Sequence, residues 1–472
     1  MLRSRIHSTP VQMNVAHGSR FRFGSWVHFI AIFVLLSVNE GRSAAAGAAN
    51  PVQALDPTPQ ALIDAWQVNR SGGIAVALIA GDKVVYHCVG QFSAKDPRTI
   101  TPDTLFEIGS ITKAFTAILL ADAVERGEIR LDDPIGEPFA KSAITYRQLA
   151  THTSGLPRMG PGIFFKEADN PLADETLARL CTSFATAAST AKPSRPLYSN
   201  FGFAVLGQAV AFAAKDTWAS AMKSRVLAPL GLRDMWLSVS EADHERLAPG
   251  HSEGRRVPHW DFDAYAPAGA IVSSARELSR LASAMLGALD TSVKPALARS
   301  MTRVVWEDEP RTAFGLAWLL ELRAGRQLVS HAGVTLGFQA FIGINAEKNL
   351  GVVVLSNDVS PIEPLAYALL NGKKLPVRRQ EQPEVRLTIQ ELDSYVGHYQ
   401  LAPSLVIEVR RDEDMLVVQL TGQESKRVYA EAKDRFFYRA IKAQYTFERD
   451  STGVVTAVVL RQNGRDLRAP RI

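Results

Sequence analysis

The order of strand-like and helix-like segments is the feature that most constrains the fold of this chain. Two apolar runs at 74–79 and 84–89 flank Gly81-Asp82, which is the pattern of a β-hairpin. Strands joined by short turns favour an antiparallel sheet, here built from both ends of one domain. The sequence predicts an α/β (α+β) domain with helices flanking the sheet and an inserted, mostly helical subdomain at 140–310. The later strands of the sheet are expected at 313–322, 327–330, 338–344 and 350–355.

Further segments define the limits of this domain. Helices are expected at 58–69 and 361–371, and the polar segment at 373–389 is typical of a linker between domains at 50–372 and 390–472. Beyond the linker, short apolar runs alternate with turns, which predicts a small C-terminal β-barrel or β-sandwich. Its strands are expected at 405–409, 415–420, 436–438, 445–447 and 454–460.

Residues 1–49 have the features of a secretory signal peptide. Arg20 and Arg22 precede an apolar run at 26–38, and small residues at 43–49 follow it. The run is shorter than the ~20 residues that a membrane-spanning helix needs. We therefore predict that the leader is cleaved and that the protein is periplasmic or secreted. If the leader were not cleaved, it would attach the protein to a membrane.

The charge of the chain argues against a nucleic-acid partner, and its cysteine content argues against a disulfide framework. The net charge is +5, but residues 1–49 hold five arginines and one glutamate, so the remainder carries only +1. Little positive charge is left to attract a nucleic acid. Cys88 and Cys181 are expected to be two separate buried thiols, because two distant cysteines do not form a disulfide framework. No cluster has metal-ligand spacing, so neither a metal nor a cofactor is expected.

Ser110 and Lys113 are the first residues that could carry chemistry. Apolar residues recur at helical spacing from Ile111 until Gly127, so Ser110 lies at a helix N-terminus and Lys113 lies one turn on. A serine nucleophile needs a base, and burial or the helix dipole would lower the pKa of Lys113 for that role. The alternative is a solvated lysine near a helix cap.

Ser-x-x-Lys occurs twice more in the chain. Ser189 to Lys192 is followed by Pro193 and is expected to be loop, and Ser220 to Lys223 lies inside a helical pattern with no turn before it. Gly109 precedes the first motif and a long helix follows it, so Ser110 is the preferred nucleophile.

Tyr198-Ser199-Asn200 and Ser330-His331-Ala332-Gly333-Val334 are the second and third motifs. A phenol near a cationic amine can act as a base, and an asparagine amide can both donate to and accept from a substrate amide. The alternative is that Ser199 or Asn200 caps a helix while Tyr198 packs beside it. A small-residue edge strand at 330–334 would let a substrate lie alongside and would offer its amides as oxyanion donors. The alternative for His331 is a strand histidine without a substrate role.

In this order, the three motifs resemble those of the serine β-lactamase and penicillin-binding superfamily. The chain is most similar to the group of class C β-lactamases, D-alanyl-D-alanine carboxypeptidases, D-aminopeptidases and related esterases. The resemblance spans about residues 55–372 and includes the stretches at 131–134, 152–157 and 268–274. The tail at 390–472 is similar to a β-rich module often appended to such hydrolases.

The resemblance implies a β-lactamase-like fold and a role for each motif. Ser110 would be the nucleophile, and Lys113 and Tyr198 would share the general-base and general-acid work of an acyl-enzyme mechanism. The other contacts to a small-molecule or peptide substrate would come from the side chain of Asn200, from His331 and Gly333, and from an oxyanion hole formed by the backbone amides of Ser110 and Val334.

One departure from the family pattern affects the expected substrate. Many relatives carry Lys-Thr-Gly where this chain has His331-Ala332-Gly333, so a cation and a hydroxyl are replaced by a mostly neutral imidazole and a methyl group. The implied reaction is hydrolysis of a β-lactam, a D-amino-acid peptide or amide, or an ester. The alternatives are an esterase without β-lactamase activity, and a non-catalytic penicillin-binding sensor or scaffold. A further alternative is that the tail is the functional part, which binds the cell wall or a partner surface, and that the hydrolase is vestigial.

Residues 250–254 and His152 could also be catalytic, but a structural explanation is preferred for each. Residues 250–254 fit the Gly-x-Ser-x-Gly nucleophile elbow, but no buried strand precedes them and no helix follows, so an exposed loop is expected. His152 is expected to be a histidine that packs a loop.

These readings predict opposite results for two serine substitutions. Ser110→Ala should abolish hydrolysis of an ester or β-lactam, because it removes the nucleophile. Ser252→Ala, at the elbow-like motif, should leave the rate nearly unchanged. Steady-state kinetics of both variants would test this, and the reverse result would assign the chemistry to Ser252.

Overall fold

The computed structural model describes the chain in segments, which exclude the predicted leader at 1–49 and most of the predicted linker at 373–389. In the described part, no helix combines the length and apolar character that a membrane span requires. The described residues are 59–67, 72–163, 170, 172–193, 195–235, 241–252, 254–306, 312–323, 326–371, 385–402, 405–421, 426–438, 443–462 and 465–472.

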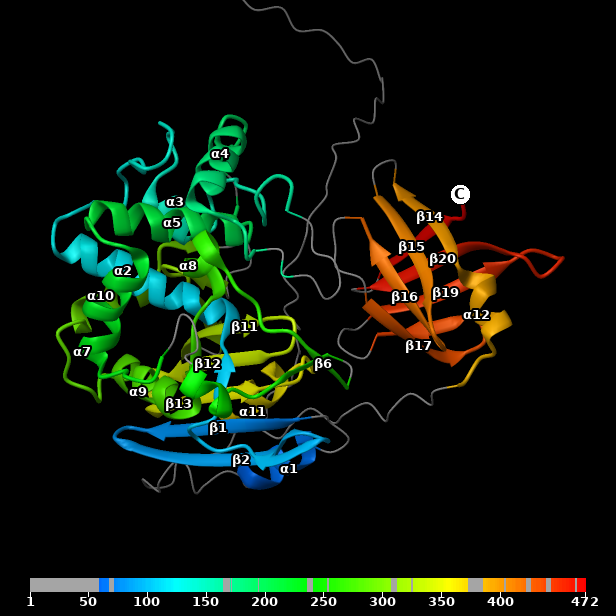
Figure 1. Ribbon diagram of the computed structural model, residues 1–472, viewed down its shortest axis with the longest axis horizontal. Helices are drawn as coiled ribbons and strands as arrows, with labels where there is room; N and C mark the ends of the chain where they lie inside the picture. Colours follow the sequence, from blue (N-terminus) through cyan, green and yellow to red (C-terminus); the bar gives the residue numbers. More distant parts are fainter. Residues whose placement is uncertain are drawn as a thin grey trace, which may run out of the picture. The chain divides into compact units, whose positions relative to one another are not determined.

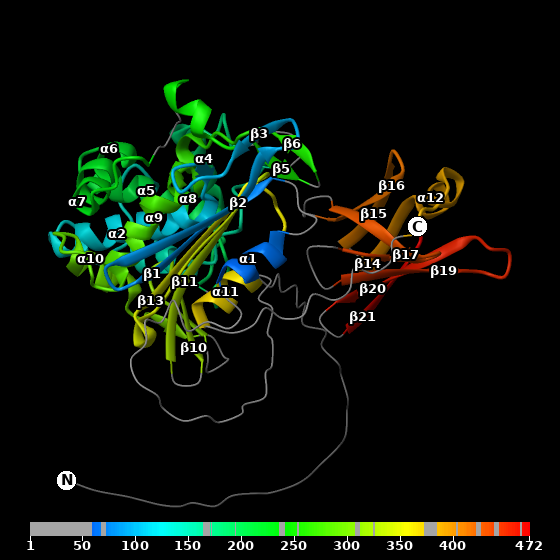
Figure 2. The ribbon, with the colours of Figure 1, turned by 90° about the horizontal axis from the view of Figure 1, so that it is seen from below.

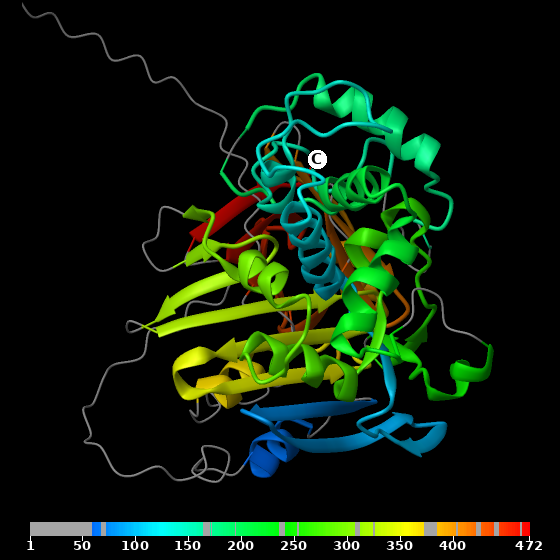
Figure 3. The same ribbon diagram turned by 90° about the vertical axis from the view of Figure 1, so that its left-hand side faces the viewer.

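A nine-stranded antiparallel sheet is the centre of the first domain (Figure 1). In Figure 3 the early strands, in blue, lie beside the late strands, in yellow, as predicted for a sheet built from both ends of the domain. The strands follow the order β3 (Asp96–Thr99), β2 (Lys83–Ser93), β1 (Gly73–Ala80), β13 (Leu350–Ser356), β12 (Gln339–Asn345), β11 (Arg326–Val334), β10 (Leu319–Arg323), β9 (Thr312–Phe314) and β8 (Val305–Trp306).

The predicted strand at 313–322 is wrong in one respect, because two strands occupy it. β9 and β10 pair with each other, and a turn separates them, closed by a hydrogen bond from Gly315 N to Trp318 O. Ala317 in this turn has a φ of +65°, which an extended strand cannot contain. A continuous apolar run does not reveal such a reversal, since the turn itself is as buried as the start of β10.

Helices cover both faces of the sheet. Figure 2 shows α1 and α11 on one side and the larger helical layer, which includes α2, α5, α8 and α9, on the other. The side chains of β1 alternate between the two cores, with Val76 facing α11 and Ala77 facing the larger layer. The helices are α1 (Pro59–Gln67), α2 (Thr112–Glu125), α3 (Tyr146–Ala150), α4 (Leu177–Ala188), α5 (Asn200–Ala213), α6 (Trp218–Met222), α7 (Ala228–Leu230), α8 (Ala266–Gly269), α9 (Ala275–Met285), α10 (Lys294–Met301) and α11 (Glu363–Asn371).

Helix α2 is the central helix of the larger layer. Its residues from Thr112 to Ala123 are all buried, so the helix is enclosed on every side rather than on one apolar face. It ends before Gly127, whose φ of +71° continues the chain in a left-handed conformation, as predicted. Polar contacts fix α8 against it: Thr116 Oγ1 donates to Pro267 O at 2.8 Å, and Ile271 N donates to Thr112 Oγ1 at 3.1 Å.

The second domain is an antiparallel sheet of eight strands that closes almost completely into a barrel. A bridge between Tyr399 and Arg471 joins its first and last strands, and Tyr395, Phe436 and Phe447 pack in its core. The helix α12 (Ile389–Tyr395) and the strands β14, β17 and β21 were not predicted. The strands are β14 (Gly397–Ala402), β15 (Leu405–Asp412), β16 (Met415–Leu420), β17 (Lys426–Ala432), β18 (Arg435–Phe437), β19 (Ala443–Arg449), β20 (Val455–Gln462) and β21 (Arg465–Pro470).

The elbow-like motif is not a loop but a hairpin. Its residues form β5 (Gly250–Ser252), which pairs with β6 (Arg255–Val257). No helix follows Ser252 there, so the strand–turn–helix context of a nucleophile elbow is absent from this part of the described chain. Cys88 and Cys181 are both free thiols, as predicted, but each is half-buried and not buried as expected.

Close packing of β11 against the start of α2 predicts that Gly333 cannot be enlarged. A Cβ atom on Gly333 would lie 2.0 Å from the backbone oxygen of Ile108. We expect Gly333→Ala to lower the free energy of unfolding by about 2 kcal/mol, because the backbone must move apart. Urea denaturation followed by tryptophan fluorescence measures this in the first domain, since all seven tryptophans precede residue 320.

Gly136→Ala is the matched control, because a Cβ atom there has no neighbour within 4 Å. Equal stability of the two variants would contradict the argument from close packing.

Candidate active site

Ser110 lies at an abrupt change of backbone direction. The short strand β4 (Leu105–Glu107) pairs with β7 (Val272–Ser274) and ends three residues before Ser110. Gly109 then adopts a φ of +48°, and a 3-10 turn at Gly109–Ile111 leads directly into α2. The half-buried hydroxyl of Ser110 is thus held by a rigid strand on one side and a buried helix on the other.

Three of the predicted site residues meet at the Ser110 hydroxyl. Lys113 Nζ donates to Ser110 Oγ at 3.1 Å, and Tyr198 Oη donates to the same atom at 2.6 Å. The lysine Nζ also lies 4.9 Å from the centre of the Tyr198 ring. Since Tyr198 is 88 positions away in the sequence, the tertiary fold brings it to the serine and lysine.

Lys113 is completely buried, and no charged group pairs with it in the described part of the chain. Its Nζ has a second hydrogen bond, to the backbone oxygen of Ala268 in α8 at 2.6 Å. Burial lowers the pKa of the amine well below its usual value, and the positive charge of Arg158 lowers it further. A neutral amine at neutral pH can accept a proton from a hydroxyl that it touches.

Tyr198 immediately precedes the N-terminus of α5. Ser199 caps this helix, accepting from Gly202 N at 2.8 Å, so the helix-cap reading of the motif is correct for Ser199. Tyr198 packs beside the helix and also reaches Ser110, so the two readings are compatible. Burial raises the pKa of the phenol, while the hydrogen bond to Ser110 and the charge of Arg158 lower it. The net direction is upward, so the phenol carries its proton in this state.

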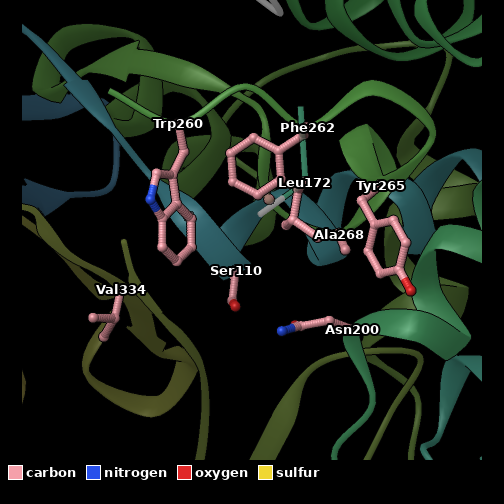
Figure 4. A pocket seen from close by; sticks show the side chains of 10 residues that line it. Ser110, Leu172, Asn200, Trp260, Phe262, Tyr265, Ala268 and Val334 are labelled. Atoms are coloured by element: carbon pink, nitrogen blue, oxygen red, sulfur yellow. The ribbon is translucent and has the colours of Figure 1, made fainter. Parts of the chain in front are cut away.

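Asn200 and an aromatic wall line a pocket beside Ser110 (Figure 4). The amide of Asn200 points toward the serine, and Trp260 and Phe262 lie on the opposite side. About 320 Å³ of empty space lies between these residues, part of it open to solvent. Its lining residues are Gly109, Ser110, Leu172, Asn200, Trp260, Phe262, Tyr265, Ala268, Gly269 and Val334.

The register of β11 leaves the Val334 amide free to face Ser110. Thr335 N donates to Phe338 O, so the adjoining pair Val334–Gln339 is of the non-hydrogen-bonded kind, and Val334 N points away from β12. On that side β10 pairs with β11 only as far as Ser330. The prediction of an edge strand is therefore wrong, because β11 lies between β12 and β10. At 331–334, however, the side of β11 that faces away from β12 has no partner in β10. A Cβ atom on Gly109 would lie 2.9 Å from Val334 N, which shows how closely this edge approaches the serine turn.

His331 lies beneath the site with its ring almost fully buried. Its Nδ1 is 2.7 Å from the backbone oxygen of Ala332, which accepts a hydrogen bond when Nδ1 carries the proton. Burial lowers the pKa of His331 to about 4, and the Lys113 amine adds to this effect when it is protonated. The motif at 330–334 therefore offers no positive charge at neutral pH.

His152 makes contacts with the Tyr198 segment that the sequence did not indicate. Its ring packs on the Tyr198 ring at a centroid distance of 4.6 Å, and its Nδ1 accepts from Ser199 N at 3.1 Å. Its backbone oxygen accepts from Leu197 N at 2.7 Å. The predicted loop-packing role is thus incomplete, because this histidine fixes the residues on both sides of the phenol.

Glu107 supports the aromatic wall of the pocket. Its buried carboxylate lies 2.8 Å from His259 Nδ1 and accepts from Trp260 N at 3.2 Å. The strand that leads into the serine turn therefore also positions the indole above the serine. The described residues contain no group of three or more potential metal ligands.

The buried imidazole of His331 predicts an acid-sensitive stability. Between pH 6.5 and pH 4 the unfolded chain binds a proton at this residue that the folded chain does not, so stability falls as the pH falls through this window. From pH 7 to pH 5 the wild type should lose about 2 kcal/mol more than His331→Gln, as read from urea denaturation of both proteins. Identical losses would mean that His331 titrates normally in the folded protein.

The chain is similar to several known proteins. A family model described as Beta-lactamase matches residues 60–374, and a second one, described as a Domain of unknown function (DUF3471), matches residues 381–470. A β-lactamase of Escherichia coli (strain K12) is 26% identical over 355 residues, which cover 66% of this chain and 91% of that protein. Penicillin-binding protein 4* of Bacillus subtilis (strain 168) is 23% identical over 436 residues, which cover 85% and 95%.

Among solved structures, a class C β-lactamase from Rhodobacter sphaeroides superposes with a TM-score of 0.58 at 25% identity. The match covers 66% of this chain and 98% of that one. The family model spans about two thirds of the chain, and it includes Ser110, Lys113, Tyr198 and His331. The chain belongs to the β-lactamase family of serine hydrolases.

Proposed function

We propose that this protein is an exported hydrolase that forms an acyl-enzyme on Ser110. The observation that carries the proposal is the pair of short contacts at one hydroxyl, to Lys113 Nζ at 3.1 Å and to Tyr198 Oη at 2.6 Å. Export rests on the leader-like sequence at 1–49.

The first half of the reaction acylates the serine. The neutral amine of Lys113 takes the proton of the Ser110 hydroxyl as its Oγ attacks the substrate carbonyl. Charge develops on the carbonyl oxygen, where the backbone amides of Ser110 and Val334 can donate to it. Tyr198 then gives its proton to the leaving group as the carbon–heteroatom bond breaks, and it regains a proton from the Lys113 ammonium.

The second half releases the acyl group. Water takes the place of the leaving group, gives a proton to the Lys113–Tyr198 pair, and attacks the acyl carbon. The ester bond to Ser110 breaks, and the pair returns a proton to Oγ. Asn200 holds the acyl part through its amide, which lies at the edge of the pocket.

The substrates that fit this proposal are β-lactams, D-amino-acid peptides or amides, and esters. An esterase without β-lactamase activity is the second candidate. The observation that favours it is the neutral His331 next to Ala332, where a lysine and a threonine would bind the carboxylate of a β-lactam. A non-catalytic sensor is less consistent with the retention of Ser110, Lys113 and Tyr198 together.

A covalent-labelling experiment tests the acyl-enzyme. Intact-protein mass spectrometry after a fluorophosphonate or penicillin should show one adduct on the wild type, mapped to the peptide that contains Ser110, and none on Ser110→Ala. Turnover of nitrocefin, a D-alanyl peptide and a p-nitrophenyl ester would then separate the subclasses. A folded wild-type protein that reacts with neither reagent would contradict the proposal.

A further inference from the structure

An exposed arginine lies over the phenol of the candidate site. The guanidinium carbon of Arg158 is 5.2 Å from the centre of the Tyr198 ring. The backbone oxygen of Arg158 accepts from the first amides of α5, Asn200 N at 2.9 Å and Phe201 N at 3.2 Å. The backbone of the arginine loop and the Tyr198–Asn200 segment are therefore joined, so the side chain of Arg158 starts from a fixed point beside Tyr198.

The guanidinium of Arg158 has no hydrogen bond and no ion pair within the described part of the chain. Other exposed arginines there do have carboxylate partners, as Arg98 has Asp96 and Arg179 has Glu175. Arg158 thus keeps its planar set of N–H donors available, and such a set suits a carboxylate in a two-point contact.

Arg158 also differs from its neighbours in keeping its charge. Burial lowers the pKa of Lys113 and of His152 well below their usual values, and it lowers the pKa of His331 to about 4. Of these four basic groups, only the arginine is a permanent cation at neutral pH. An anionic group of a substrate would therefore pair with Arg158 and not with His331.

Arg158 lies outside the aromatic pocket, so the two can contact different parts of a substrate. Trp260, Phe262 and Tyr265 line the pocket next to Asn200, and Arg158 is not part of that lining. In the proposed mechanism Tyr198 protonates the leaving group, so the leaving group must lie along the phenol that Arg158 covers. The acyl group then faces the aromatic side.

We infer that Arg158 is a specificity-determining residue that binds a carboxylate on the leaving-group side of the substrate, while the aromatic pocket accepts an apolar acyl group. The inference rests on the proposed function, because it uses Tyr198 as the proton donor to the leaving group. It predicts a substrate with an apolar acyl part joined to an acidic leaving group.

Two chromogenic esters with the same acyl group test this inference. One is p-nitrophenyl phenylacetate, and the other is its analogue with 3-carboxy-4-nitrophenol as the leaving group. The wild type should prefer the carboxylated ester, by the ratio of the two kcat/KM values. Arg158→Gln should lower that ratio about tenfold to a hundredfold, through loss of a charge-assisted contact. Arg158→Lys should lower it less, because the charge remains without the planar fork.

Arg179→Gln is the matched control, since it removes the same charge from an exposed, ion-paired arginine on α4 and should leave the ratio unchanged. Added salt should reduce the wild-type preference and leave the ratio in Arg158→Gln nearly constant. A ratio that stays within about twofold in Arg158→Gln would overturn the inference, even if both rates fall, because the arginine would then act on Tyr198 and not on the substrate.

The proposed function can fail separately. If neither ester is hydrolysed in a Ser110-dependent manner, with Ser110→Ala as the reference, the acyl-enzyme proposal is wrong and the inference falls with it. If both esters are hydrolysed through Ser110 with equal kcat/KM, only the inference about Arg158 is wrong.

Discussion

The removal of the Lys113 amine from water is the physical constraint on which the site depends. An isolated ammonium in a dry interior is costly, and the neighbours of this nitrogen are a hydroxyl and a backbone carbonyl, neither of which carries a full charge. The neutral form of the amine is therefore favoured. Burial this complete requires that α2 be enclosed along almost its whole length, with α5, α8 and α10 packed around it. The layered architecture thus creates the base as well as positioning it.

Different segments of the chain supply the groups at the Ser110 hydroxyl and the wall of the pocket. Ser110 and Lys113 are neighbours on one helical turn, and Tyr198 is fixed by the cap of α5 and by His152. The pocket wall instead comes from the segment at 260–269, which Glu107 attaches to β4 through backbone and side-chain contacts. Substitution of Trp260 or Phe262 can alter what fits beside the serine, whereas the backbone of Ala268 in the same segment also holds Lys113.

The sequence was informative where structure is local and much less so where it depends on distant contacts. The Ser110–Lys113 pair follows from helical spacing, and the first hairpin follows from Gly81-Asp82 between two apolar runs. The contact of His152 with Tyr198 and the support of Trp260 by Glu107 join residues far apart in sequence, so no pattern around either residue indicates them. The reversal at Ala317 was missed because a buried turn is as apolar as a buried strand. The polar strands β17 and β21 were missed because only part of each faces the barrel core.

The position of β1 in the sheet has a consequence for how the chain reaches this structure. β1 lies between β2, its immediate neighbour in sequence, and β13, so that Ile74 pairs with Val89 on one side and with Ser356 on the other. The first hairpin can form early, but one of its edges stays open until almost the whole domain has been made. Contacts so distant in sequence must overcome the entropy of closing a very long loop, which slows folding. During synthesis the apolar strand Gly73–Ala80 is therefore an unpaired edge for most of the time, the stage at which such a chain is most prone to aggregate.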